Sequence, residues 1–465
     1  MKPRGLLGYE LERDAKLDGV TAHGGLPVVA EAYRAFGVGR SVAQHLQVKQ
    51  RRRGFDEATL VESFVELLAA GGECLDDFAV LAQDHGLVRL LEHPWPSPEA
   101  ARKFLYAFHD EHVVAHPPDQ LAWIPPETPP LEGLAAVNRD LVATFARHAA
   151  AGETATLELD ATLIESHKRE ALPHYEGGRG YQPQVVVWSE ARVIVADQFR
   201  DGNVAAEMQA LPLVRQGFAA LPDSVRQRFF RADAACYQHG VLDWLRDEAR
   251  TDGPPGPIGF AISADMSREL RRAIERLPSN AWRYFPREPA DEYRQWAEVE
   301  FVPSDGTTRK GAAPDRYLAI RILPRQGDLF ADGEAVKHFA VVTNLDWDGA
   351  RILDWQRQKA GSVEAVHDAL KNDLGAGVLP CGRFGANAAW FRLNVLTHNL
   401  LQALQQIALP PTLRDARLKR LRFALFDLPG RIVQHARRTL LRLGASAAWF
   451  PALTDARLRL ATLPA

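Results

Sequence analysis

Cysteine is scarce in this chain of 465 residues, which has only Cys74, Cys236 and Cys381. An odd number of widely spaced cysteines fits neither a disulfide framework nor a paired zinc site, so reduced thiols are expected. Long apolar runs are also missing. No segment approaches the roughly 20 apolar residues of a membrane-spanning helix, and the first residues lack the apolar stretch of a signal peptide. The sequence therefore predicts a cytoplasmic protein without membrane contact.

A large excess of positive charge is absent as well, because the chain has 56 Lys and Arg residues and 59 Asp and Glu residues, which gives a net charge of −3. This balance excludes nucleic-acid binding through a uniformly basic surface, so any such contact must use local patches. The hydrophobic content of 46% is ordinary for a globular protein. A chain of this length exceeds one hydrophobic core, and two or three structural units are expected.

The first part of the chain has a helical pattern. Apolar residues recur at steps of three and four from residue 30 to 84 and from 97 to 114, which predicts a small helical domain over residues 1–116. The basic residues Arg51, Arg52 and Arg53 follow one of these helices and suit phosphate contacts, with a solvated charge run as the alternative. Six prolines between residues 117 and 130 then predict an extended linker over residues 117–133.

Beyond the linker the pattern alternates between strands and helices. We expect strands at 156–160, 184–188, 193–199 and 226–233, with helices at 132–149, 204–220 and 238–250. This order predicts an α/β, ribonuclease H-like core, formed by residues 134–250 and 351–410. Residues 251–350 read as a mostly β insertion into that core, with strands expected at 258–263, 296–302, 317–323 and 339–344 and one helix at 267–277.

Two of the expected strands end on a carboxylate. In the first, Leu157 and Leu159 point to one face, whereas Glu158 and Asp160 point to the other. The second ends at Asp233, and we expect both aspartates at one edge of the sheet. A carboxylate in this position suits a metal ion, with a solvated Asp in the following loop as the alternative.

A third carboxylate lies on a helix expected over residues 361–371. Ser362 is the expected N-cap, and Val363, Val366 and Leu370 form an apolar stripe. Glu364 and Lys371 share an adjacent stripe, two turns apart. Charges on a solvated helix surface are the alternative interpretation.

These features together resemble a known family, the bacterial insertion-sequence transposases of the DDE cut-and-paste type (transposase DDE domain group 1). The resemblance rests on Leu157–Thr162, Gly180–Pro183, Phe230–Tyr237, the helix from Glu364 to Lys371, and Gly385–Phe391. It covers most of the chain from about residue 155 onward and, more loosely, the helical N-terminus. In the family's Tyr-x-x-Arg-x-x-x-Glu signature, Arg357 and Ala360 replace the Tyr and the Arg. Arg357 and Lys359 are therefore only hypothetical substitutes in DNA binding.

The resemblance implies a transposase that binds terminal repeats and catalyses metal-dependent DNA cleavage and strand transfer. It implies a ribonuclease H-like (retroviral integrase-like) core with Asp160, Asp233 and Glu364 as catalytic metal ligands. Two Mg²⁺ or Mn²⁺ ions would activate the nucleophile and stabilise the leaving oxygen, with Asp160 bridging both. Lys371 would contact a DNA phosphate as a point charge. The implied partners are double-stranded transposon-end and target DNA, bound by a homodimer.

Two further regions are candidates for DNA contact. Between residues 414 and 459 of the C-terminal segment 411–465, eleven Lys and Arg face three Asp, a net charge of 11 − 3 = +8, and Arg437 and Arg438 are the chosen phosphate ligands. Recognition of the ends is assigned to the N-terminal helices by analogy. In the insertion, Trp347 is the candidate to stack on a base of a DNA hairpin, with Trp296 next. The alternative is that Trp347 caps the insertion's own core.

Three other functions stay open. The first is a ribonuclease H-like nuclease that cuts without joining strands, and the second is an inactive, domesticated DNA-binding derivative. A metal hydrolase acting on other substrates is the third, although the basic C-terminal segment argues against it.

Overall fold

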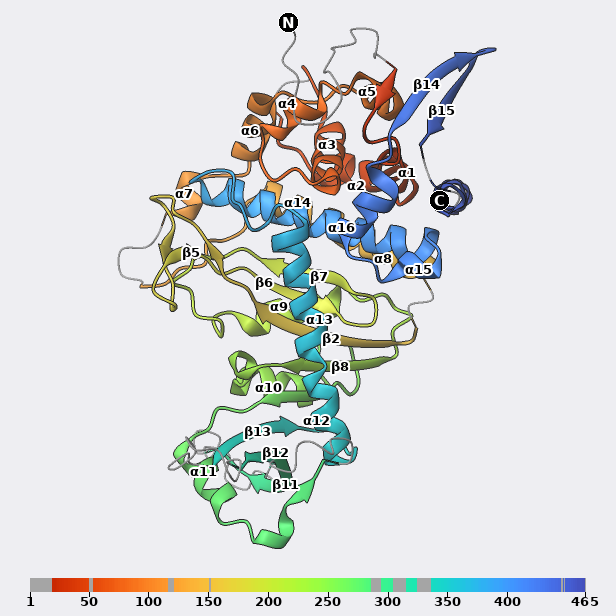
Figure 1. The fold of residues 1–465 in the computed structure, drawn as a ribbon. Coiled ribbons are helices and arrows are strands. Elements are labelled where there is room, and N and C mark those ends of the chain that lie inside the picture. The colour runs from red at the N-terminus through yellow and green to blue at the C-terminus, as the bar shows by residue number, and fades with distance from the viewer. Residues whose placement is uncertain are drawn as a thin grey trace, which may run out of the picture.

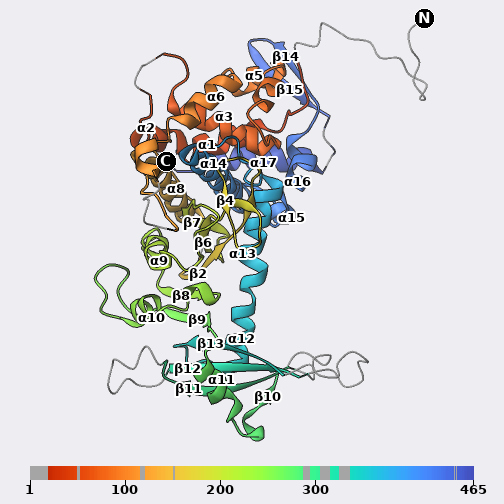
Figure 2. The ribbon, with the colours of Figure 1, turned by 90° about the vertical axis from the view of Figure 1, so that its left-hand side faces the viewer.

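The computed structural model describes residues 19–49, 53–115, 121–149, 152–285, 294–303, 315–323, 336–444, 446 and 448–464. Helices gather at one end of the molecule, a large sheet lies in the middle, and strands β10–β13 lie at the other end (Figure 1). A rod made of helices α12 Gly349–Arg357 and α13 Lys359–Asp368 runs beside the sheet from the far strands toward the helical end, as the turned view also shows (Figure 2). The predicted DNA contacts Arg51 and Arg52 lie outside the described residues.

The helical end confirms the helical pattern of the N-terminal sequence. Its helices are α1 Pro27–Ala35, α2 Val38–His45, α3 Glu57–Ala70, α4 Asp77–Leu81, α5 His85–Leu91, α6 Pro98–Tyr106, α7 Glu111–Val114 and α8 Pro129–His148. The single helix expected over 97–114 is wrong, because Asp110 accepts a hydrogen bond from the His112 amide and starts α7 separately. Helix α8 begins inside the expected linker, since Pro129 occupies its first turn, where a missing N–H is harmless.

Within the described residues, nine strands form one mixed sheet in the order β10-β11-β12-β13-β9-β8-β2-β6-β7. Their bounds are β2 Thr154–Ala161, β6 Gln184–Trp188, β7 Val193–Gln198, β8 Gln227–Ala232, β9 Gly259–Ser263, β10 Arg283–Tyr284, β11 Arg294–Phe301, β12 Asp315–Ile322 and β13 Lys337–Thr343. Strand β2 is antiparallel to β6 and parallel to β8, and β8 is parallel to β9. Helices α9 Ala210–Ala219 and α10 His239–Arg246 follow β7 and β8 along the chain.

The strands expected in the insertion are present, but they do not form a separate sheet. β9 pairs with β8 on one side and with β13 on the other. Its central residues, Phe260, Ala261 and Ile262, are all fully buried, as in a strand covered on both faces and hydrogen-bonded along both edges. The insertion therefore extends the central sheet, and the sequence boundary at residue 251 does not mark a break in it. Helix α11, Arg268–Glu275, lies within this region.

Helix α14, Phe384–Ala403, joins the helical end to the sheet and is buried along nearly its whole length. It packs against α3, α8 and β7. Asn399 bridges two of these elements, because its amide donates to Asn138 on α8 at 2.7 Å and its carbonyl oxygen accepts from the Ile194 amide on β7 at 2.8 Å. The helical end and the sheet therefore share one continuous core.

The C-terminal segment folds back onto the N-terminal helices. It contains α15 Pro411–Arg414, α16 Leu418–Leu421, β14 Gly430–His435, β15 Arg438–Leu443 and α17 Trp449–Ala461. Strand β1, Val20–Thr21, pairs with β14, so residues far apart in sequence share a small sheet. Gly25 approaches this segment so closely that a side chain there would collide with the Leu425 carbonyl.

Among the described helices, none combines the length and apolar character needed to cross a lipid bilayer.

Candidate active site

The ends of two neighbouring strands bring Asp160 and Asp233 together. β2 and β8 run parallel with Leu159 opposite Ala232, so the next residue of each chain segment is an aspartate. The Lys359 ammonium lies 3.2 Å from Asp160 Oδ1 and 3.6 Å from Asp233 Oδ2. The expected meeting of these two carboxylates at one sheet edge is therefore observed, with a lysine between them.

Lys359 belongs to the helical rod that runs beside the sheet. Helix α12, Gly349–Arg357, starts at Asp348, whose carboxylate accepts from the Ala350 and Arg351 amides. Helix α13, Lys359–Asp368, follows directly, and a π-helical turn at Ala369–Asp373 ends the rod. The expected N-cap at Ser362 is wrong, because the helix has already started and the Ser362 hydroxyl lies inside it, bonded to the Gln358 carbonyl.

His367 approaches Asp160 from the same helix, two turns after Lys359. Its Nε2 atom lies 3.6 Å from Asp160 Oδ2, and the side chain is only 7% exposed. Glu364 is exposed on α13 less than one turn before His367. The ion pairs that reach Asp160 and Asp233 within the described residues come from Lys359 and His367. The structure thus places Glu364 on the adjoining helix without a described contact to either aspartate.

The two aspartates have different acidities. Burial tends to raise the pKa of Asp160, but His367 and Lys359 together outweigh it and lower that pKa. Burial raises the pKa of Asp233, and the Asp160 charge adds to this effect against the opposing charge of Lys359. Burial would lower the pKa of Lys359, yet the two carboxylates raise it. The site therefore holds one firmly ionised carboxylate, a second less acidic one and a charged amine.

A buried ion pair lies two residues upstream of the aspartates. Glu158 on β2 and Arg231 on β8 are cross-strand partners, and Arg231 Nε donates to Glu158 Oε1 at 2.5 Å. Their side chains are 0% and 4% exposed. Arg231 also donates to the Trp355 carbonyl on α12, and the Ser362 hydroxyl on α13 donates to Glu158. The pair therefore fastens the rod to both strands that end in the aspartates.

Comparison with known proteins identifies the family. A family model described as "Transposase DDE domain group 1" matches residues 10–465. The chain belongs to this transposase family. The resemblance found in the sequence is thus confirmed at the level of the family, whose members generally use divalent metal ions. No match was found among curated proteins. Among solved structures, a piggyBac transposase synaptic complex with hairpin DNA is similar, with 10% identity, a TM-score of 0.43, and coverage of 89% of this chain and 82% of that chain.

Lys359 differs from its sequence-based assignment. It is predicted to contact DNA, but in this transposase its side chain is 12% exposed and its amine pairs with the two aspartates. Sequence reasoning missed His367 as a neighbour of Asp160, and it missed Arg231 altogether. A signal for the second did exist, since Glu158 and Arg231 each precede an aspartate by two positions and therefore share its strand face.

Other predicted DNA contacts lie on the surface of the transposase. Arg357 is exposed at the end of α12, and Arg53, Arg437 and Arg438 are also exposed. Arg437 and Arg438 occupy the tip of the β14–β15 hairpin, at the helical end of the molecule (Figure 1). Lys371 lines a groove with Arg417 and Lys419, beside Leu163, three residues beyond Asp160.

Both candidate stacking residues pack against other side chains, although only Trp296 is fully buried. Trp296 is 2% exposed in a second hydrophobic cluster, so its proposed contact with a base conflicts with its burial. Trp347 is half-buried, with ring centroids 5.4 Å from Phe229 and 5.7 Å from Trp355, and the Arg351 guanidinium lies 4.3 Å over its ring. These contacts favour the alternative interpretation, a tryptophan that caps the core of this region.

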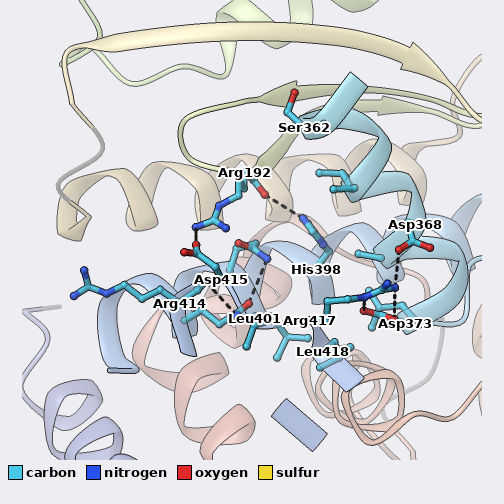
Figure 3. Close-up of a pocket in the computed structure, with 18 of the residues that line it drawn as sticks. Arg192, Ser362, Asp368, Asp373, His398, Leu401, Arg414, Asp415, Arg417 and Leu418 are labelled. Atoms are coloured by element: carbon cyan, nitrogen blue, oxygen red, sulfur yellow. Dashed lines mark hydrogen bonds and ion pairs between the residues drawn. The ribbon is translucent and has the colours of Figure 1, made fainter. Parts of the chain in front are cut away.

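A pocket of about 440 Å³ lies beside α13, but neither Asp160 nor Asp233 lines it (Figure 3). Three arginines and three aspartates line it, and five of these six side chains pair with one another: Arg192 with Asp415, and Arg417 with Asp368 and Asp373. His398 at its base contacts the Arg192 carbonyl at 3.1 Å. Because the charges balance internally, the pocket gives no sign of a basic DNA channel or of an acidic metal site.

A second group of potential metal ligands lies in the helical end. Glu62, Glu66 and His93 bring their ligand atoms within 4.8 Å of one another. His93 Nε2 lies 3.3 Å from Glu66 Oε2, and Arg34 Nε lies 3.3 Å from Glu62 Oε1. Burial raises the pKa of Glu66 to about 7. These groups neutralise one another, and we interpret them as a structural ion-pair cluster.

Proposed function

We propose that this transposase excises a DNA element at its ends and joins it to target DNA by cut-and-paste transposition. Asp160, Asp233 and Glu364 are the proposed catalytic carboxylates. The observation that carries the proposal is the convergence of Asp160 and Asp233 at adjacent parallel strand ends, beside the helix that bears Glu364. The order β7-β6-β2-β8-β9, with an antiparallel trio followed by two parallel strands, supports a ribonuclease H-like core.

The donor set fits divalent metal ions. Carboxylate oxygens suit hard cations such as Mg²⁺ or Mn²⁺, and the lysine amine held between Asp160 and Asp233 supports a cation at this position. Two ions held by Asp160, Asp233 and Glu364 would supply activation of the attacking oxygen and stabilisation of the leaving oxygen. The Glu158–Arg231 pair contributes by holding α13 at a fixed position against the strands.

The proposed partners are transposon-end and target DNA, bound by a homodimer. Membership in a transposase DDE family supports DNA as the substrate. We assign phosphate contacts near the aspartates to Lys371 and Arg357, and more distant contacts to the helical end, including Arg53, and to the Arg437–Arg438 hairpin. Surface lysines and arginines in such places bind DNA without reading its sequence.

The test uses Asp160→Asn, Asp233→Asn and Glu364→Gln in a Mg²⁺-dependent cleavage assay on DNA carrying the element's ends. Each variant should lose at least about a thousandfold in cleavage rate, because electrostatic and metal stabilisation of the transition state is worth several kcal/mol. End binding and the melting temperature should stay close to those of the parent. Glu165→Gln, a change in an exposed carboxylate of the short strand after Asp160, is the matched control.

Normal cleavage by Glu364→Gln would remove that residue from the site and leave the third ligand to be found elsewhere. Cleavage without any joined product in the parent protein would favour the nuclease function over transposition.

A further inference from the structure

The carboxylate site contains its own cation. The Lys359 ammonium contacts both aspartates, at 3.2 Å and 3.6 Å, and its side chain is 12% exposed. A lysine is rarely buried to this extent unless it is paired. Because Asp160 and Asp233 are like charges held close by neighbouring strands, an amine between them removes much of their mutual repulsion. Lys359 is therefore an internal counter-ion of the pair.

The groups that face this amine come from three elements. Asp160 is the penultimate residue of β2, and Asp233 directly follows β8. His367 lies on α13, as Lys359 does, and approaches the other carboxylate oxygen of Asp160. Neither ring nitrogen of His367 has a hydrogen-bond partner within the described residues, and the ring is buried. Asp160 is thus approached by a cation on one oxygen and by an imidazole on the other.

A divalent ion and this lysine compete for the same oxygens. Mg²⁺ binds carboxylate oxygens at about 2.0–2.1 Å and demands near-octahedral geometry, which leaves no room for an ammonium that contacts the same two carboxylates. Repulsion between the two cations in a partly buried site acts in the same direction. One of them has to leave, and only the lysine is tethered by a flexible four-carbon stem.

We propose that Lys359 is a displaceable counter-ion, which holds Asp160 and Asp233 together until a divalent metal ion replaces it and which then binds a substrate phosphate. This inference rests on the proposed function, since it assumes that the two aspartates are metal ligands. Displacement moves one positive charge from the carboxylates to the phosphate, and no covalent bond changes. Metal binding and DNA binding are in this way coupled through a single side chain.

The first test measures Mn²⁺ binding without DNA, by calorimetry and by the metal-induced rise in melting temperature. Lys359→Gln should bind Mn²⁺ about tenfold more tightly than the parent, because the competing cation is gone. Lys359→Arg keeps the charge and should bind no more tightly than the parent. Lys103→Gln is the matched control, because this lysine is exposed on α6 and pairs with Glu99 on the same helix, and its Mn²⁺ affinity should equal that of the parent.

The second test measures binding of a DNA end in Mn²⁺ and in EDTA. Adding the metal should raise the DNA affinity of the parent more than that of Lys359→Gln, because only the parent has an amine to release. Equal or weaker Mn²⁺ binding by Lys359→Gln overturns the proposal if Asp160→Asn still abolishes Mn²⁺ binding. If Asp160→Asn binds Mn²⁺ like the parent, the metal site of the proposed function fails, and the counter-ion proposal fails with it.

Discussion

Two regions of this transposase contain a pair of carboxylates and a histidine, and they differ in how the groups are held. At the sheet edge, Asp160, Asp233 and His367 come from separate elements, and the Asp233 side chain is 50% exposed. In the helical end, Glu62 and Glu66 lie one turn apart on α3, and the Glu66 side chain is 0% exposed. Similar residue types thus form an accessible site in one place and an enclosed ion-pair cluster in the other. Solvent exposure and the elements that supply the side chains, more than residue type, distinguish the candidate active site from the structural ion-pair cluster.

The largest expected change in stability comes from removing the ion pair that attaches the rod to the sheet. Arg231→Met leaves the Glu158 carboxylate buried without its partner, which should lower the free energy of unfolding by about 3–5 kcal/mol. Urea denaturation measures this loss. Adding Glu158→Met to Arg231→Met replaces both partners by apolar side chains of similar size. The double variant should recover most of the lost free energy of unfolding.

If the double variant regains stability and also cleaves DNA normally, the ion pair has no role in positioning the carboxylates. We expect stability to return and cleavage to remain impaired, because apolar side chains cannot bond the Trp355 carbonyl and the Ser362 hydroxyl.

A smaller change in the free energy of unfolding is expected when the pH changes, because Glu66 in the helical end titrates. Folding raises the pKa of Glu66 from 4.5 to about 7. The folded protein therefore keeps a proton that the unfolded chain releases, so the stability from this group is full below pH 4.5 and is lost as the pH rises to about 7. The pKa of His93 is also raised, despite its burial, by Glu66, and its contribution likewise disappears above its folded pKa.

Denaturation at pH 5 and at pH 8 measures this effect in the parent and in Glu66→Gln. The parent should lose up to about 3 kcal/mol relative to the variant across this range. Parallel behaviour of the two proteins would show that Glu66 is ionised throughout, and the contrast between the two regions would weaken.

The smallest expected effect concerns the exposed hairpin. Changing Arg437 and Arg438 together to Gln should weaken binding to specific and unrelated DNA alike and flatten the salt dependence by about two units of slope. The double change Arg271→Gln and Arg272→Gln, on the exposed face of α11, is a matched control for charge loss elsewhere. An unchanged salt series would assign Arg437 and Arg438 to solvated surface.

Much of the site could be predicted because its information is local. The alternation that ends at Asp160 marks a strand end, and the apolar run before Asp233 marks another. The helix of Glu364 was also expected from its periodicity. Its start was misplaced, because Ser362 has the character of a cap, while the helical rod begins upstream at Asp348.

What could not be predicted depends on contacts between distant segments. The ion pair of Lys359 with Asp160 joins residues 199 apart, and no spacing rule connects them. The pairing of β9 with both β8 and β13 likewise depends on tertiary contacts, because a buried strand must form backbone hydrogen bonds along both of its edges. The β14–β15 hairpin could not be predicted, because its turn places Ala436 and Arg437 at positive φ. Glycine or asparagine at these positions would have indicated a tight turn.

The pairing of β1 with β14 has a consequence for synthesis of the chain. Val20 and Thr21 leave the ribosome early, whereas their partners Arg431 and Gly430 leave it some 400 residues later. Helix α1 likewise packs against α17, which is synthesised near the end of the chain. Contacts of such long sequence separation form slowly, and the early helices expose apolar surface until they do. The helical end is therefore expected to be completed last, so that truncated translation products would be left without a finished fold and open to proteolysis.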